Sequence, residues 1–276
     1  MKTSKITMLL TGGLTGLLML SQSLMAQDVK TEVRKTGSFT AISNHCSADI
    51  LLSQGPETLV KVEADAKAID KIETTVENGE LRIDIKGTIM NAKVLRVFVT
   101  SPSITKISLN GSGDLEGMNL IKAADLVVSI NGSGDVDVDL DATNFEGRIN
   151  GSGDMKVEGI RGSFKLDVNG SGDFSGKDLQ LASSDITNHG SGDIKLTGSS
   201  VITTIKSNSS GDINTSGLKS DKVSAECHGS ADIYVFAATS LDVRSNSSGD
   251  IYYKGDPKTK TVSLKGSGEL HQMDNK

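Results

Sequence analysis

The sequence is poor in aromatic residues, which make up 3% of its 276 residues, and it contains no tryptophan. Aromatic side chains normally supply much of a globular core. A chain of this size with so few of them is expected to build its core from narrow stacks of aliphatic side chains. The shortage therefore favours a repetitive architecture over an ordinary globular domain.

Cysteine is scarce as well, because Cys46 and Cys227 are the only two. In a fold whose units follow one another in chain order, these residues lie too far apart for a disulfide. We therefore expect two unpaired, partly buried thiols. No Pro-rich or Ser-rich linker divides the chain, which indicates one continuous domain over residues 27–276.

Long hydrophobic runs are absent except near the start. Residues 1–26 resemble a secretory signal peptide, with Lys2 and Lys5 ahead of an apolar run over 8–20 and Ala26 as a small residue before the cut. This run is short for a membrane span. We expect an exported protein without a membrane span, located in the periplasm, on the outer surface or in the medium of a Gram-negative bacterium.

The chain also has no excess of positive charge. Its net charge is −6, and cleavage after residue 26 removes two lysines and no acid, which makes it −8. A protein of this charge is repelled by phosphate backbones and by anionic lipid. The sequence therefore argues against nucleic acid as a partner.

What the sequence does contain is a glycine-rich motif that recurs nine times, first as Asn110-Gly111-Ser112-Gly113-Asp114. The acidic residues of successive copies are 18 to 21 residues apart: Asp114, Asp135, Asp154, Asp173, Asp193, Asp212, Asp232, Asp250 and Glu269. A constant period near twenty is typical of stacked units that are too small to bury a core alone.

Apolar and polar residues alternate across each motif, which is a strand's period of two. Stacking such units about 4.8 Å apart predicts an all-β, right-handed parallel β-solenoid of about nine regular coils of roughly 19–20 residues. The regular repeats cover residues 106–276. Residues 27–105 lack the period and are predicted to be an irregular β cap at the N-terminal end, with strands near 37–43, 48–54, 58–64, 72–77, 80–86 and 94–100 and an Asn78-Gly79 hairpin turn.

The stacked motifs should form a column of carboxylates, in which neighbours about 5 Å apart repel by about 0.8 kcal/mol in water. One explanation is that each Asp accepts hydrogen bonds from turn amides. The other is that the column binds cations, with calcium as the candidate cofactor. The residues proposed for such a metal site are Asp135, Asp154, Asp173, Asp193 and Asp212.

A second outer column should contain asparagine side chains. The predicted members of this structural ladder are Asn110, Asn131, Asn150, Asn169, Asn208 and Asn246. His45, His189 and His228 occupy the same slot in their motifs. His189, Ser191 and Asp193 have the residue types of a hydrolase triad, but a strand spaces them nearly 7 Å apart, too far for the required hydrogen bonds. We therefore predict no catalytic residues.

Aromatic side chains recur in one outer slot near the C-terminus. Tyr234 and Tyr252 each follow their Asp by two residues, His271 follows Glu269 in the same way, and Tyr253 is adjacent. Stacking across neighbouring strands is one interpretation. The other is a small platform that binds a sugar or a protein partner.

These features together resemble a known family, the adhesin-head domain called the GIN domain, which is found in exported bacterial envelope proteins. The resemblance rests on the NGSGD-type repeats and on three earlier segments: Gly37-Ser38-Phe39 with Ile42 and Asp49-Ile50, Val76-Glu77-Asn78-Gly79-Glu80-Leu81-Arg82-Ile83, and Val97-Phe98-Val99-Thr100-Ser101-Pro102. It implies a β-solenoid-like fold, an extracytoplasmic location and no enzymatic activity.

The sequence thus predicts an exported, non-enzymatic binding protein, adhesin-like, whose partner is an envelope protein or a glycan. One alternative is a polysaccharide-acting β-helix enzyme, by analogy of fold. This alternative requires a groove with clustered acids and an Arg or Lys that break the repeat. Another alternative is a structural rod stabilised by cations.

Overall fold

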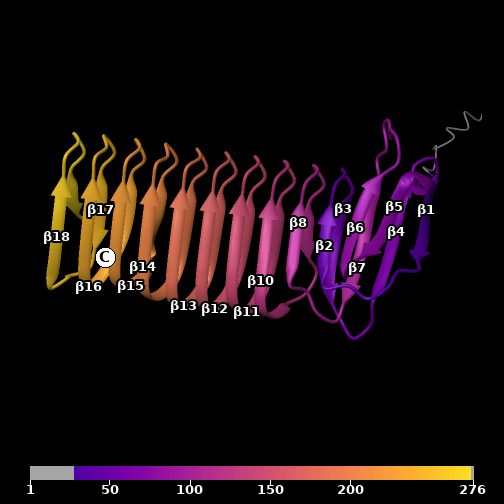
Figure 1. The fold of residues 1–276 in the computed structure, drawn as a ribbon, viewed down its shortest axis with the longest axis horizontal. Coiled ribbons are helices and arrows are strands. Elements are labelled where there is room, and N and C mark those ends of the chain that lie inside the picture. The colour runs from indigo at the N-terminus through magenta and orange to yellow at the C-terminus, as the bar shows by residue number, and fades with distance from the viewer. Residues whose placement is uncertain (1–27, 275–276) are drawn as a thin grey trace, which may run out of the picture.

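The computed structural model describes residues 28–274, which wind into the expected parallel β-solenoid of about nine turns (Figure 1). The signal peptide predicted for residues 1–26 lies outside the described residues. Within residues 28–274, no helix is long and apolar enough to cross a membrane.

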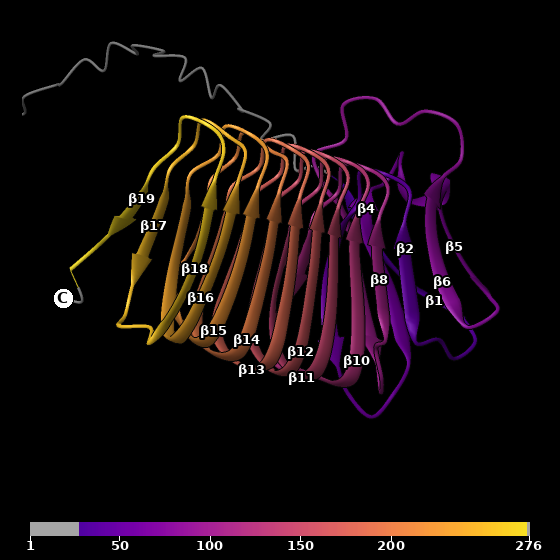
Figure 2. The same ribbon diagram turned by 60° about the vertical axis from the view of Figure 1, so that its left-hand side comes forward.

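Each regular coil contains one long strand, bent at a corner, and one turn that carries the glycine-rich motif (Figure 2). Parallel pairing keeps equivalent residues side by side, so that Val136 lies next to Met155 and Met155 lies next to Phe174. The long strands are β10 (Ile121–Ile130), β11 (Val136–Ile149), β12 (Met155–Val168), β13 (Phe174–Asn188), β14 (Ile194–Ser207), β15 (Ile213–Cys227) and β16 (Ile233–Ser245).

The motif itself is a turn between strands, although its alternation suggested a strand. Two of its glycines are required by close approach, because the turns of successive coils stack directly on one another. A Cβ added at Gly151 would lie 1.8 Å from the carbonyl oxygen of Gly132, and one at Gly153 would lie 2.0 Å from that of Gly134. Any larger residue must therefore shift the backbone.

The core consists of aliphatic columns that run along the rod. The residue after each motif Asp is almost fully buried, as for Val136, Met155, Ile194 and Ile213 at 0–1% exposure. The only aromatic cluster described in the core joins Phe145, Phe164 and Phe174, with ring centroids 5.6 to 6.4 Å apart. The expected core of narrow aliphatic stacks is confirmed.

The first and the second coil are formed by segments that lie far apart in the sequence. β2 (Ala41–Asn44) and β3 (Asp49–Gln54) lie directly against β8 (Lys106–Leu109) and β9 (Leu115–Gly117). Asp49 and Asp114 are 65 residues apart, a little over three periods of the repeat, yet they lie in neighbouring coils. The two residues belong to adjacent coils because residues 55–105 form an insertion between them.

The insertion and the N-terminus cover one end of the solenoid. β6 (Glu80–Ile85) and β7 (Leu95–Ser101) pair in parallel with β2 and β3, and β4 (Leu59–Asp65), β5 (Ile72–Glu77) and β1 (Val29–Arg34) add antiparallel strands around them. A 3₁₀ helix at Ile69–Lys71 directly precedes β5. β1 was not predicted.

The predicted Asn-Gly hairpin is confirmed between β5 and β6. Asn78 and Gly79 both have positive φ, 51° and 77°, as a two-residue hairpin of this type requires. At the opposite end the last coil is broken into β17 (Ile251–Lys254), β18 (Thr259–Leu264) and β19 (Leu270–Gln272).

Candidate functional site

Each motif Asp is tied to the backbone of the next coil. Its Oδ1 atom accepts a hydrogen bond from the main-chain N–H of the equivalent acid one coil further on. The distances are 2.9 Å from Asp114 to the amide of Asp135, 2.8 Å from Asp135 to that of Asp154, and 2.8 Å from Asp250 to that of Glu269. This arrangement continues from Asp49 to Glu269, and charge-assisted bonds of this kind offset the repulsion between neighbours.

The same bonds use one oxygen of every carboxylate in the predicted metal site, Asp135, Asp154, Asp173, Asp193 and Asp212. Among residues 28–274, no group of three or more acidic, His or Cys side chains could hold a metal ion. Calcium binding by this column stays the alternative hypothesis to a column held by backbone hydrogen bonds.

The asparagine ladder forms over four consecutive coils. The Nδ2 groups of Asn131, Asn150 and Asn169 each donate to the Oδ1 of the preceding Asn, at 2.8, 2.8 and 3.0 Å. Asn208 bonds instead to Nδ1 of His189 at 3.2 Å. In the described chain Asn246 has no side-chain partner, since His228 in the neighbouring coil is bonded to Glu226 at 2.9 Å.

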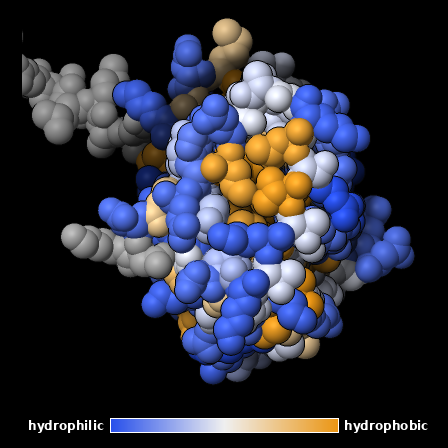
Figure 3. Space-filling view, turned by 90° about the vertical axis from the view of Figure 1, so that its left-hand side faces the viewer, coloured by the Kyte–Doolittle hydropathy of each residue, from blue (hydrophilic) through white to orange (hydrophobic). Residues whose placement is uncertain are grey.

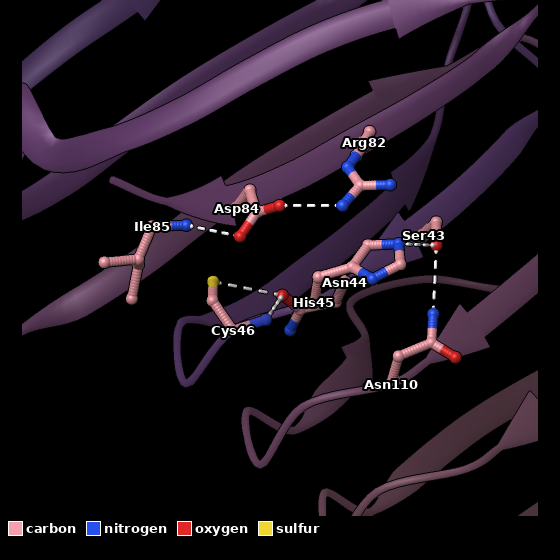
Figure 4. A network of polar contacts seen from close by, with 8 residues as sticks. All are labelled: Ser43, Asn44, His45, Cys46, Arg82, Asp84, Ile85 and Asn110. Carbon is pink, nitrogen blue, oxygen red and sulfur yellow. Dashed lines mark hydrogen bonds and ion pairs between the residues drawn. The ribbon is translucent and has the colours of Figure 1, made fainter. Parts of the chain in front are cut away.

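The ladder begins at the first coil, as Figure 4 shows. Asn110 donates to Oγ of Ser43 at 3.1 Å, and Ser43 is 2.7 Å from Nε2 of His45. Buried Asn44 spans the turn from inside, where its Oδ1 accepts from the amide and the thiol of Cys46, both at 3.2 Å. The turn is therefore held by side chains where the glycine pattern is incomplete.

Cys46 and Cys227 are both buried and unpaired, as expected from their separation. Burial raises the pKa of the Cys46 thiol above its usual value. This thiol is therefore held in its neutral, unreactive form.

Tyr234, Tyr252 and His271 form an outer aromatic column on the last three coils. The rings of Tyr234 and Tyr252 are stacked with centroids 4.7 Å apart and planes within 7°, and His271 stacks on Tyr252 at 5.1 Å. The two hydroxyls donate to the carboxylates of Asp232 and Asp250 at 3.5 and 3.3 Å. Tyr234, Tyr252 and His271 are all partly exposed.

The carboxylates beside this column influence its titration. Burial, together with the charge of Asp232, raises the pKa of Tyr234, and burial with the charge of Asp250 does the same for Tyr252. The pKa of Asp250 is lowered, first by the amide of Glu269 and then by bonds from Tyr252 and His271. The tyrosines thus stay neutral donors, while Asp250 stays an ionised acceptor.

Tyr253 was predicted to belong to this outer surface, and its placement there is wrong. It points into the core, is 5% exposed, and donates to Gln272 at 3.0 Å. Sequence reasoning also missed Phe236, which follows Tyr234 by two residues on β16, is partly exposed, and pairs in register with Lys254. The period of two would have assigned both residues correctly.

A depression of about 650 Å³ crosses the bent corners of β11 to β14. Asp139, Glu158, Arg161 and Asp178 are among its lining residues. Glu158 is paired with Lys177 at 3.2 Å, and Arg161 is paired with Asp141 at 3.3 Å. The depression has acids and an Arg, but none of these four side chains is buried, and burial is what commonly adjusts a catalytic acid.

A family model described as "Putative auto-transporter adhesin, head GIN domain" matches residues 38–202 and 161–257. The chain belongs to the GIN-domain family. This GIN-domain protein is therefore an envelope or exported protein with an adhesin-like binding role. No curated protein matches it.

Solved structures share the fold of the GIN-domain chain. One from Parabacteroides distasonis, called a "putative lipid binding protein", is 24% identical with a TM-score of 0.65. Two are called a "putative adhesin". One, from the same species, is 18% identical with a TM-score of 0.69, and the other, from Parabacteroides merdae, is 16% identical with a TM-score of 0.67. Each alignment covers 90% of this chain and 98% of the other.

Proposed function

We propose that this protein is a non-enzymatic, adhesin-like binding protein of a Gram-negative envelope, which holds a glycan or an envelope protein on its outer aromatic column. Membership of a family of adhesin heads supports this proposal. A site in the periplasm, on the surface or in the medium is compatible with it.

The observation that carries the proposal is a break in the repeat. The outer slot two residues after each acid is charged or polar in the first six regular coils, where it holds Glu116, Asp137, Lys156, Ser175, Lys195 and Asn214. In the last three coils it holds Tyr234, Tyr252 and His271. A specific binding surface is expected at one place on the rod. The Asn and Asp ladders instead recur in successive coils, and their side chains bond to the equivalent residues of neighbouring coils.

The chemistry of this column suits recognition of hydroxylated ligands. The partly exposed rings of Tyr234, Tyr252 and Phe236 supply apolar contact, and the carboxylates of Asp232 and Asp250 supply acceptors. Aromatic side chains with a polar tip are the residues that most often anchor binding surfaces.

The test is capture of envelope components and glycans by the purified protein and by a Tyr234→Ala, Tyr252→Ala double variant. We expect at least about tenfold weaker capture by the variant, since loss of two anchor residues costs more than 1.4 kcal/mol. Lys195→Ala, in the same slot of an earlier coil, is the matched control and should bind normally. Equal binding by the double variant and the control would refute the aromatic column.

A further inference from the structure

The two ends of the solenoid differ in how they are finished. The N-terminal end is covered by β1, β4, β5 and β6, as Figure 1 shows. The C-terminal end terminates in β18, whose six residues are all exposed, with Val262 at 44% and Leu264 at 37%. An apolar patch lies over this end in Figure 3.

The exposed residues of β18 continue the core columns of the rod. β18 pairs with β16 so that Val262 lies beside Val243 and Leu264 beside Ser245, both of which are buried. β16 is the only strand paired with β18 in the described part of the chain, so the other edge of β18 presents free backbone groups. An uncovered apolar strand edge is a template for pairing with another chain.

We propose that this end is covered by the same end of a second copy, in a two-fold, tail-to-tail dimer in which the two β18 strands pair in antiparallel fashion. The occupant must offer a free strand edge and apolar residues in matching columns. The N-terminal end of another copy offers a different edge, because its strand β1 is antiparallel to its neighbour and carries Lys30, Glu32 and Arg34. A second β18 offers both features.

The sequence of β18 is compatible with pairing to itself. In a register centred on Val262, Val262 lies opposite its own copy, and Lys260 lies opposite Leu264. Directly opposite residues of an antiparallel pair share one face, so the inner residues of one copy meet those of the other. No lysine lies opposite a lysine, which avoids the repulsion that would disfavour the pair.

Lys260 is the residue that would otherwise protect this edge. It occupies an inner position beside Leu241, and an inward charge at a sheet edge normally blocks pairing. Here its Nζ lies 3.3 Å from the hydroxyl oxygen of Tyr253 and 5.5 Å from the centroid of that ring. The ammonium group is thus held against its own coil, and Val262 and Leu264 remain for the partner.

The dimer is tested by measuring the mass of the purified protein by sedimentation velocity over a range of concentrations. We expect a dimer in the micromolar range, and Val262→Asp should raise its Kd by at least about tenfold, because the interface would bury an unpaired carboxylate. Val201→Asp is the matched control, since Val201 is 49% exposed on β14 in the middle of the rod. It should leave the dimer intact.

A second variant keeps the proposal testable if Val262→Asp does not fold. Val262→Cys should form a disulfide-linked dimer under oxidising conditions, because the two copies of residue 262 face each other, while Val201→Cys should not. A monomer at all concentrations, a dimer unaffected by Val262→Asp, or open filaments would each overturn the proposal. Filaments would indicate head-to-tail contacts instead.

Discussion

The hydroxyl oxygens of Ser207 and Ser209 lie 2.9 Å apart inside the turn that follows β14. Ser209 also donates to the carbonyl of Gly211 at 3.1 Å, and Ser245 and Ser247 repeat the arrangement at 2.8 Å. Ser209 and Ser247 occupy the position of the first motif glycine. In every coil that has Leu, Ile or Val two residues before this position, the position is glycine. A serine in the turn therefore occurs together with a second small, bonding side chain.

This relationship predicts a coupling between positions 149 and 151. Gly151→Ser should destabilise the protein by about 1–3 kcal/mol, since its Cβ would crowd the carbonyl of Gly132. The loss of unfolding free energy caused by Gly151→Ser should be smaller in an Ile149→Ser background, because the two substitutions together recreate the serine pair. Urea unfolding of the four proteins in this double-mutant cycle measures the coupling.

Gly37→Ser is the control for the cycle. A Cβ at Gly37 would have only one neighbour within 4 Å, Cγ1 of Val76 at 3.9 Å, so this change should have little effect. Equal costs of Gly151→Ser in both backgrounds would contradict the coupling.

The aspartate column should depend more on its hydrogen bonds than on its charge. Asp154→Ala leaves the amide of Asp173 without its side-chain acceptor and should cost about 1–3 kcal/mol. Asp154→Asn keeps an oxygen acceptor and removes one charge from the column, so it should cost less than the alanine variant. Thermal unfolding of both proteins distinguishes the two effects, and an asparagine variant as unstable as the alanine variant would show that charge matters more.

Calcium should have little effect on unfolding. One oxygen of each carboxylate in the column already accepts a backbone amide, and the described residues gather no set of three metal-binding side chains. We expect the same melting temperature with calcium and with a chelator. A ligand at about 100 times its Kd stabilises by about 2.7 kcal/mol, so calcium binding would give a clear increase that Asp154→Asn and Asp173→Asn should reduce.

Stability should fall in acid. A bond from Arg82 lowers the pKa of Asp84, one from Arg148 lowers that of Glu146, and the amide of Glu269 lowers that of Asp250. A carboxyl with a lowered folded pKa contributes stability above its unfolded pKa, and this contribution is lost as the pH falls through the folded value. Since ordinary values lie near 4, we expect a constant melting temperature from about pH 7 to about pH 5 and a decrease below about pH 4.

Arg148→Met provides the matched variant for this pH profile. It removes the donor at 2.7 Å from Glu146, so the variant should lose less stability between pH 5 and pH 3 than the parent protein. Identical profiles would indicate that other carboxylates dominate the acid response.

The regular part of the solenoid could be predicted because its sequence is locally periodic. A step of 18 to 21 residues brings equivalent residues into register, and alternation assigns the inner and outer columns. Val136, Met155 and Phe174 were therefore expected in one buried column, and the tyrosines at 234 and 252 in one outer column. Both expectations are confirmed.

The rest could not be read from periodicity. The period does not reveal an insertion, so it could not show that Asp49 and Asp114, which are 65 residues apart, lie in adjacent coils. Glycine at position 151 is required by the carbonyl of Gly132, which stacks against it, and this close contact is visible only in the structure. Whether the outer rings bind a partner depends on chemistry outside this chain.

The insertion of residues 55–105 has a consequence for the order of folding. Equivalent residues of neighbouring regular coils are about 19 residues apart. β2 and β3 instead pair with β8 and β9, and the equivalent residues Asp49 and Asp114 are 65 residues apart. Contacts distant in sequence form more slowly. We expect the middle of the rod to nucleate first and the earliest-synthesised segment to be built in last, so that the protein assembles against the direction in which it is made.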